Sequence, residues 1–144
     1  MDRAGRQIFW ESVKTLRRLA EESDSFRPPH PVKVQIVRKC GSDCACDSLA
    51  ETRLHRRRRV ARGQDRFYFR INILEKLSGI HAVDVLVHEW SHLLDWEPGH
   101  VEDDSHRFKT LEDEMHHHHR DSWGIVFARL YRQFHWPKPK KGSR

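Results

Sequence analysis

Long apolar runs are missing from this sequence, whose mean hydropathy is −0.84. A membrane-spanning helix needs about 18 or more consecutive apolar residues, and no such stretch occurs, so we expect no contact with a membrane. The first residues also lack the basic, apolar and small-residue order of a secretory signal. Cysteine is scarce, and Cys40, Cys44 and Cys46 are too few and too clustered for a disulfide framework. These absences together favour a cytoplasmic protein.

The length of 144 residues predicts one domain spanning 1–144, with residues 136–144 as a basic tail. A chain of this size buries roughly two-thirds of its unfolded surface, which is enough to hold a site on a packed core. Its net charge of +6 is unevenly spread, because seven arginines lie between Arg53 and Arg66. Such a cluster can contact nucleic acid or can simply be a solvated loop. The candidate nucleic-acid contacts are the consecutive residues Arg56, Arg57, Arg58 and Arg59.

Hydrophobic periodicity divides the chain into helices and strands. An amphipathic helix is predicted over 7–21, with Ile8, Val13, Leu16, Leu19 and Ala20 on its apolar side, and a linker to residue 30 follows it. Alternation predicts strands over 32–38 and 66–73, whereas the segment from the cysteines to about residue 64 is ambiguous. Helices are predicted over 81–96 and from about 113 to 134. This order predicts an α+β fold with a small antiparallel or mixed sheet.

The strongest chemical pattern lies in the helix predicted over 81–96. His88 and His92 are four residues apart, so their imidazoles lie on one helical face and can take two positions of one tetrahedral Zn²⁺. Glu89 directly follows the first histidine, which places its carboxylate beside the open coordination position. A carboxylate there can accept a proton from the attacking water. The alternative is a surface helix with solvated histidines.

Two features favour the metal over that alternative. The helix has a separate apolar stripe that includes Val83, Val87 and Trp90. The histidine face also carries His81 and Asp84, so we expect a polar face within a buried helix. Buried polar groups need partners, and a metal ion would be one.

A third ligand is expected downstream, in the approach to the last helix. His119 lies four residues before Trp123, on the face predicted to point inward, and His116 lies seven residues before Trp123. We expect His119 to be the ligand. The alternatives are His116 and the carboxylates Glu112 and Glu114, which would complete a His-His-Glu site.

The run His88–Trp96, followed by His119 and then Trp123, Gly124 and Tyr131, resembles SprT-like zincins, in particular small proteins of bacteria and phages. The resemblance covers about residues 66–134. It implies a zincin-like fold with an HExxH active-site helix and a C-terminal helix, Zn²⁺ as cofactor, and a metallopeptidase acting on a protein or peptide. The family's general base matches Glu89, and its final histidine stands where His119 stands.

Several residues have open secondary roles. Cys40, Cys44 and Cys46 are either free thiols or ligands of a second zinc together with His55 or Asp43. Tyr68 or Tyr131 could stabilise an oxyanion, Asp95 could orient a histidine ligand, and most tryptophans should line the core or a cleft. The competing function is a non-catalytic nucleic-acid-binding or protein-interaction module with a structural zinc. Glu89 distinguishes the two functions, because a closed structural site does not need that carboxylate.

Overall fold

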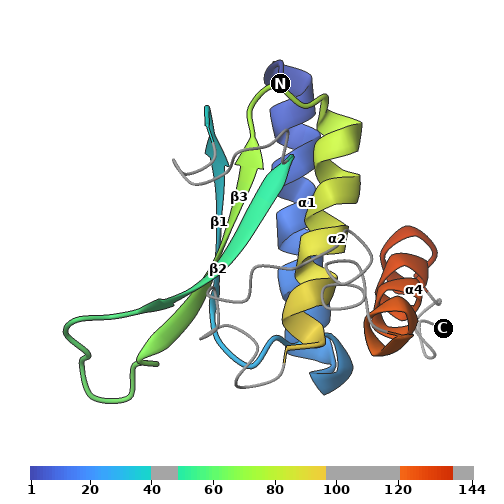
Figure 1. The fold of residues 1–144 in the computed structure, drawn as a ribbon. Helices are drawn as coiled ribbons and strands as arrows, with labels where there is room; N and C mark the ends of the chain where they lie inside the picture. Colours follow the sequence, from blue (N-terminus) through green and yellow to red (C-terminus); the bar gives the residue numbers. More distant parts are fainter. Residues whose placement is uncertain (40–48, 97–120, 138–144) are drawn as a thin grey trace, which may run out of the picture.

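The structure is a computed structural model and describes residues 1–39, 49–96 and 121–137. Figure 1 shows two long helices beside a small sheet, with a third helix next to the second. Within these ranges no helix is long and apolar enough to cross a bilayer. The elements in chain order are α1 (Arg3–Glu22), a 3-10 turn (Asp24–Phe26), β1 (Val32–Val37), β2 (Ala50–Arg56), β3 (Phe67–Leu74), α2 (Gly79–Leu94) and α4 (Asp121–His135).

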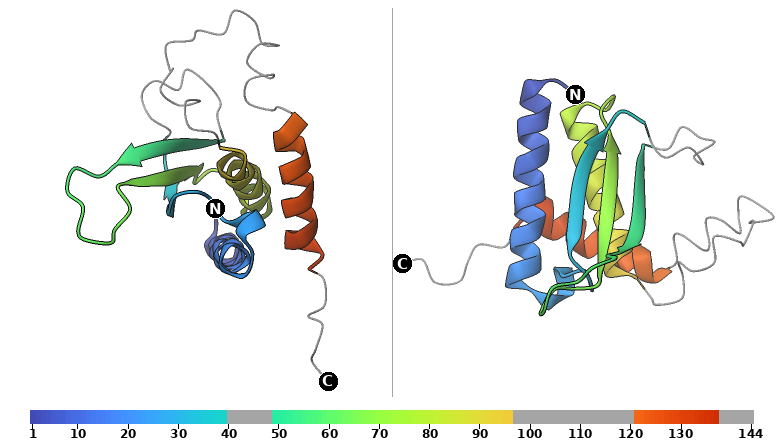
Figure 2. Two further views of the ribbon diagram at one scale, coloured as in Figure 1. Left: turned by 90° about the horizontal axis from the view of Figure 1, so that it is seen from below. Right: turned by 90° about the vertical axis from the view of Figure 1, so that its left-hand side faces the viewer.

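The sheet has the strand order β1-β3-β2, with β3 parallel to β1 and antiparallel to β2. The fold is therefore α+β with a small mixed sheet, which confirms that part of the prediction. The ambiguous segment contains β2, an edge strand. Figure 2 shows that α1 and α2 cover the same face of the sheet. Below, that face is called the inner face and the opposite one the outer face.

The core forms between the inner face and the helices. On β3 the alternate residues Phe69, Ile71 and Ile73 are fully buried there, as the period-2 pattern predicts. On α1 the buried stripe contains Phe9 rather than Ile8, whose side chain is 50% exposed, so the prediction for Ile8 was wrong. Phe9, Val13 and Leu16 repeat at spacings of four and three, and Ile8 lies about 100° around the helix from that stripe.

Helices α1 and α2 cross in backbone contact at two glycines. A Cβ atom built on Gly79 would lie 2.4 Å from Cα of Gly5, a separation that no side chain tolerates. Both helices begin near this crossing: the Asp2 side chain caps α1 by accepting from Gly5 N at 2.7 Å, and Ser78 caps α2. The crossing therefore sets where α2 starts relative to the sheet.

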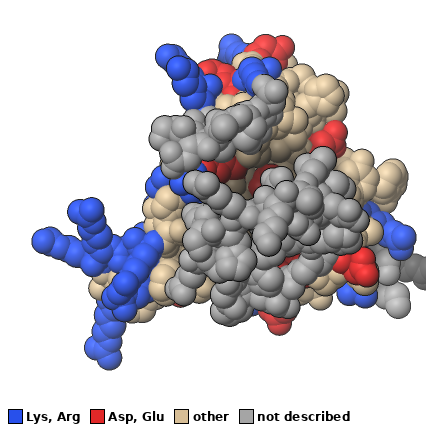
Figure 3. Space-filling view, in the orientation of Figure 1, with Lys and Arg blue, Asp and Glu red and all other residues tan. Residues whose placement is uncertain are grey.

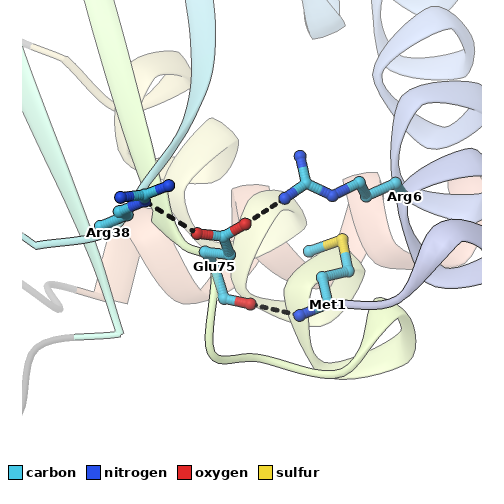
Figure 4. Close-up of polar contacts among 4 residues, drawn as sticks. All are labelled: Met1, Arg6, Arg38 and Glu75. Atoms are coloured by element: carbon cyan, nitrogen blue, oxygen red, sulfur yellow. Dashed lines mark hydrogen bonds and ion pairs between the residues drawn. The ribbon is translucent and has the colours of Figure 1, made fainter.

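Glu75, in the turn between β3 and α2, connects three parts of the chain (Figure 4). Its carboxylate pairs with Arg6 of α1, and Arg38 beyond β1 lies 3.7 Å from the second oxygen. Its carbonyl oxygen accepts a hydrogen bond from the Met1 amino group at 2.5 Å. These side chains are partly exposed, so each ion pair contributes at most about 1 kcal/mol. Their effect is to hold the turn that leads into α2.

Candidate metal centre and catalytic carboxylate

Helix α2 brings the two predicted histidine ligands together. The Nε2 atoms of His88 and His92 are 3.1 Å apart, and their ring centroids are 4.9 Å apart. Two nitrogens bound at 2.0–2.1 Å to one tetrahedral zinc ion would be separated by about 3.3 Å. The histidine pair therefore fits two positions of a single tetrahedral ion.

Aromatic side chains from α4 cover this histidine pair. The Trp123 ring stacks on His92 at 5.1 Å and lies 4.9 Å from the His88 ring, and Phe127 lies 5.1 Å beyond Trp123. Trp123 thus lies on the inward side of α4, as predicted for the last helix, and Leu130 of the same helix is fully buried. An apolar wall of this kind limits water around the histidines and strengthens electrostatic interactions there.

The start of α4 is tied to the end of α2 by a side-chain contact. Ser122 Oγ donates a hydrogen bond to the Asp95 carboxylate at 3.0 Å. Asp95 is predicted to orient a metal ligand, and the contact described here also ties it to α4. It helps to hold Trp123, the next residue along the chain, against the histidines.

Glu89 lies beside the histidine pair and points toward the sheet. Its carboxylate Oε2 accepts a hydrogen bond from Thr52 Oγ1 of β2 at 2.5 Å. Burial raises the pKa of Glu89, and the Thr52 hydrogen bond opposes part of that rise. Within the described ranges Oε1 has no hydrogen-bond donor. One oxygen is thus held by the protein, and the other remains able to exchange a proton.

Thr52 reaches Glu89 because of the sheet's register. It pairs with Ile71 of β3, so it projects from the inner face together with Ala50 and Leu54. The intervening residues of β2 project from the outer face. Sequence reasoning missed Thr52, because the strand that carries it was not assigned and its contact with Glu89 spans 37 residues.

The rest of the predicted metal site lies elsewhere or outside the described residues. Within residues 1–39, 49–96 and 121–137 no group of three or more His, Cys, Asp or Glu side chains is placed to hold a metal ion. His81 and Asp84 are exposed, so the expectation of a uniformly buried polar face was wrong. The reason is that α4 packs beside the C-terminal turns of α2 only (Figure 1). Outside the described ranges lie His119, His116, Glu112, Glu114, Asp43, Cys40, Cys44 and Cys46.

The aromatic residues considered for the oxyanion or the core lie in three different places. Tyr68 projects from the outer face, where it stacks with His55, so it cannot serve an oxyanion beside Glu89. Tyr131 packs against Phe127 at 5.6 Å, on the same side of α4 as Trp123. Trp136 is 67% exposed and does not line the core.

The function of this chain has to be argued from its site. Comparison with family models, with curated proteins and with solved structures gave no significant match.

Proposed function

We propose that this protein is a zinc-dependent peptidase with a zincin-like fold. His88 and His92 would hold Zn²⁺ together with His119, and Glu89 would act as the general base. The observation that carries the proposal is the pair of Nε2 atoms 3.1 Å apart on the helix that also carries Glu89, whose pKa is raised by burial of the carboxylate. The cytoplasm is the compartment that the composition favours.

Bound zinc would supply Lewis acidity, polarising the scissile carbonyl and lowering the pKa of water to about 7. The residues of the chain do the rest. Glu89 accepts the proton of the attacking water and then delivers it to the leaving nitrogen, while the Thr52 hydroxyl holds Oε2 in place. Trp123 and Phe127 shield the histidines from bulk water.

The substrate class follows from the edge of the sheet. β3 is central and paired on both sides, whereas β2, among the described residues, has one unpaired edge and carries Thr52. An extended polypeptide can add to such an edge through main-chain hydrogen bonds. A protein or peptide substrate would then pass close to Glu89.

The competing proposal is a structural zinc without catalysis. It leaves Glu89 unexplained, because burying a carboxylate costs free energy and a closed structural site gains nothing from it. Within the described residues Glu89 forms no ion pair, and its hydrogen bond goes to Thr52 on the edge strand. That arrangement favours a proton-transfer role.

The experiment compares wild type with Glu89→Gln, a nearly isosteric change. Zinc content is measured by elemental analysis after a chelator wash and reloading, and hydrolysis is measured on unfolded casein. We expect about one zinc per chain in both proteins and a 10²–10⁴-fold loss of hydrolysis in the variant, the usual worth of a general base. Absence of zinc from the reloaded wild type, or a site closed by four protein ligands, would contradict the proposal.

A further inference from the structure

The outer face of the sheet is polar and rich in cations, and the peptidase proposal does not use it. All described helices lie on the inner side, so within the described ranges no helix covers this face (Figure 2). The register places Lys33 of β1 beside Arg70 of β3, and Arg70 beside Arg53 of β2. Three neighbouring strands thus present a cation at the same level.

These cations gather around one aromatic ring. Lys33 Nζ lies 4.5 Å from the centre of the Tyr68 ring, and the Arg57 guanidinium carbon lies 4.9 Å from it. Arg70 is 5.8 Å away and donates a hydrogen bond from Nη2 to the Tyr68 hydroxyl at 3.0 Å. The His55 ring stacks on Tyr68 at 5.3 Å with an interplanar angle of 17°. The result is a ring pair surrounded by three positive charges.

Little negative charge balances them. Glu51 is the carboxylate on this face, and it is paired with Arg53. Among the described residues Lys33, Arg57 and Arg70 form no ion pair. Within the described part of the chain the buried Nε of Arg70 has no acceptor, although a buried guanidinium donor normally has one. The same positive field acts on His55, whose pKa is lowered by burial and then by Arg70, Arg53 and Lys33. The face therefore offers three cationic side chains that an anionic ligand could contact.

The positive surface continues into the hairpin that joins β2 and β3. Figure 3 shows basic side chains projecting beyond the body of the molecule, and the basic residues of this hairpin are all arginines. Arg57 stands at the junction: its backbone N bonds to Arg66 O at 2.8 Å, and its Nε bonds to Asp65 O at 3.1 Å. The arginine side chains of the hairpin beyond Arg57 are exposed, namely Arg58, Arg59, Arg62 and Arg66. A ligand that contacts both the outer face and the hairpin must be extended and carry several negative charges.

We propose that the outer face binds the backbone of a single-stranded nucleic acid, with phosphates contacting Lys33, Arg57 and Arg70. Guanidinium groups match phosphate oxygens in a bidentate geometry, which favours phosphate over scattered carboxylates. An open sheet with a half-buried ring pair is suited to unpaired bases, which stack on aromatic side chains, whereas a duplex keeps its bases inside. The site differs from the sequence-based expectation, since of the four consecutive arginines only Arg57 belongs to it.

The test measures binding of a fluorescent 20-nucleotide oligothymidylate to the full chain by anisotropy, at several salt concentrations. Lys33→Gln/Arg57→Gln removes two charges from the outer face. Arg17→Gln/Arg18→Gln removes two charges from exposed positions of α1, on the other side of the sheet, and serves as the matched control. We expect the first pair to weaken binding at least about tenfold at low salt and to reduce the slope of log K against log salt by about 1.4, or 0.7 per lost contact. The control should bind within about twofold of wild type, because it leaves the phosphate contacts intact.

Three results would overturn the proposal. Equal losses in both double variants would mean that only net charge matters. Tighter binding of a 20-base-pair duplex or of polyglutamate of equal length would assign the face to another class of partner. No binding of the oligothymidylate by wild type at low salt would show that the outer face does not bind single-stranded nucleic acid. Matched circular dichroism spectra and melting temperatures ensure that a loss of binding is not a loss of fold.

Discussion

Thr52 and Glu89 are joined by a 2.5 Å hydrogen bond between the edge strand and the helix that carries the histidine pair. Thr52 lies between Ala50 and Leu54 on the inward-facing side of β2. A hydroxyl at this position replaces water as a donor to a buried carboxylate. We infer that Thr52 is a positioning residue: it fixes one oxygen of Glu89 and, through the edge strand, the distance between substrate and base.

Thr52→Val tests this role, since it keeps the shape of the side chain but removes the donor. If the proposed peptidase activity is present, kcat should fall about tenfold while KM stays within about twofold, because the lost interaction orients the base and does not bind substrate. Thr52→Ser should restore most of kcat, since it restores the hydroxyl. Zinc content should be equal in all three proteins. A change in KM alone, or no rescue by serine, would limit Thr52 to a structural role.

The third metal ligand is predicted from the spacing before α4. Trp123 lies against both histidines, and His119 precedes it by four residues. His119→Ala should therefore release zinc to a competing chelator at a concentration at least about tenfold lower than for wild type, as expected when one of three ligands is lost. His118→Ala, the matched control, should bind zinc like wild type. Equal retention by both variants would move the ligand to His116, Glu112 or Glu114.

Gly79→Ala should destabilise the fold by about 1–3 kcal/mol, the usual cost of overpacking, because the new Cβ would meet the backbone of Gly5. A shift of the melting temperature by several degrees is expected from that change. Gly124→Ala is the control: a Cβ there meets nothing within 4 Å, and alanine in an exposed helix position should add about 0.5–1 kcal/mol. A melting temperature for Gly79→Ala equal to that of wild type would show that the two helices can separate without cost.

Local patterns predicted most elements well. Phe69, Ile71 and Ile73 alternate strictly and lie in β3, and the helix predicted over 81–96 is α2, from Gly79 to Leu94. The histidine geometry is also predictable, because residues four apart in a helix must be neighbours. What these patterns lack is information about strand order. Alternation does not say that β1 pairs in parallel with β3, or that β2 occupies an edge.

β2 was missed for a physical reason that concerns function. A strand is recognised when one face is apolar, but the inward face of β2 contains Thr52, and its outward face contains Glu51, Arg53 and His55. Thr52 contacts Glu89, and His55 stacks on Tyr68 on the outer face. Two of the residues that obscure the strand signal, Thr52 and His55, thus belong to the two proposed sites.

The last prediction concerns His55 and the pH dependence of stability. Its pKa in the folded protein is lowered by burial and by nearby cations, so the unfolded chain binds a proton more readily. The free energy of unfolding should therefore decrease as the pH falls below about 6.5, the pKa of His55 in the unfolded chain. It should continue to decrease until the pH passes the lower pKa of His55 in the folded protein. His55→Gln removes this proton uptake, so its stability should depend less on pH in that interval than the stability of wild type. Urea unfolding of metal-free protein, followed by tryptophan fluorescence from pH 7.5 to 5, measures both slopes, and His81→Gln at an exposed position of α2 is the control. Parallel curves for wild type and His55→Gln would show that Arg53, Arg70 and Lys33 exert no net field on this ring. That result would weaken the argument that the outer face binds anions.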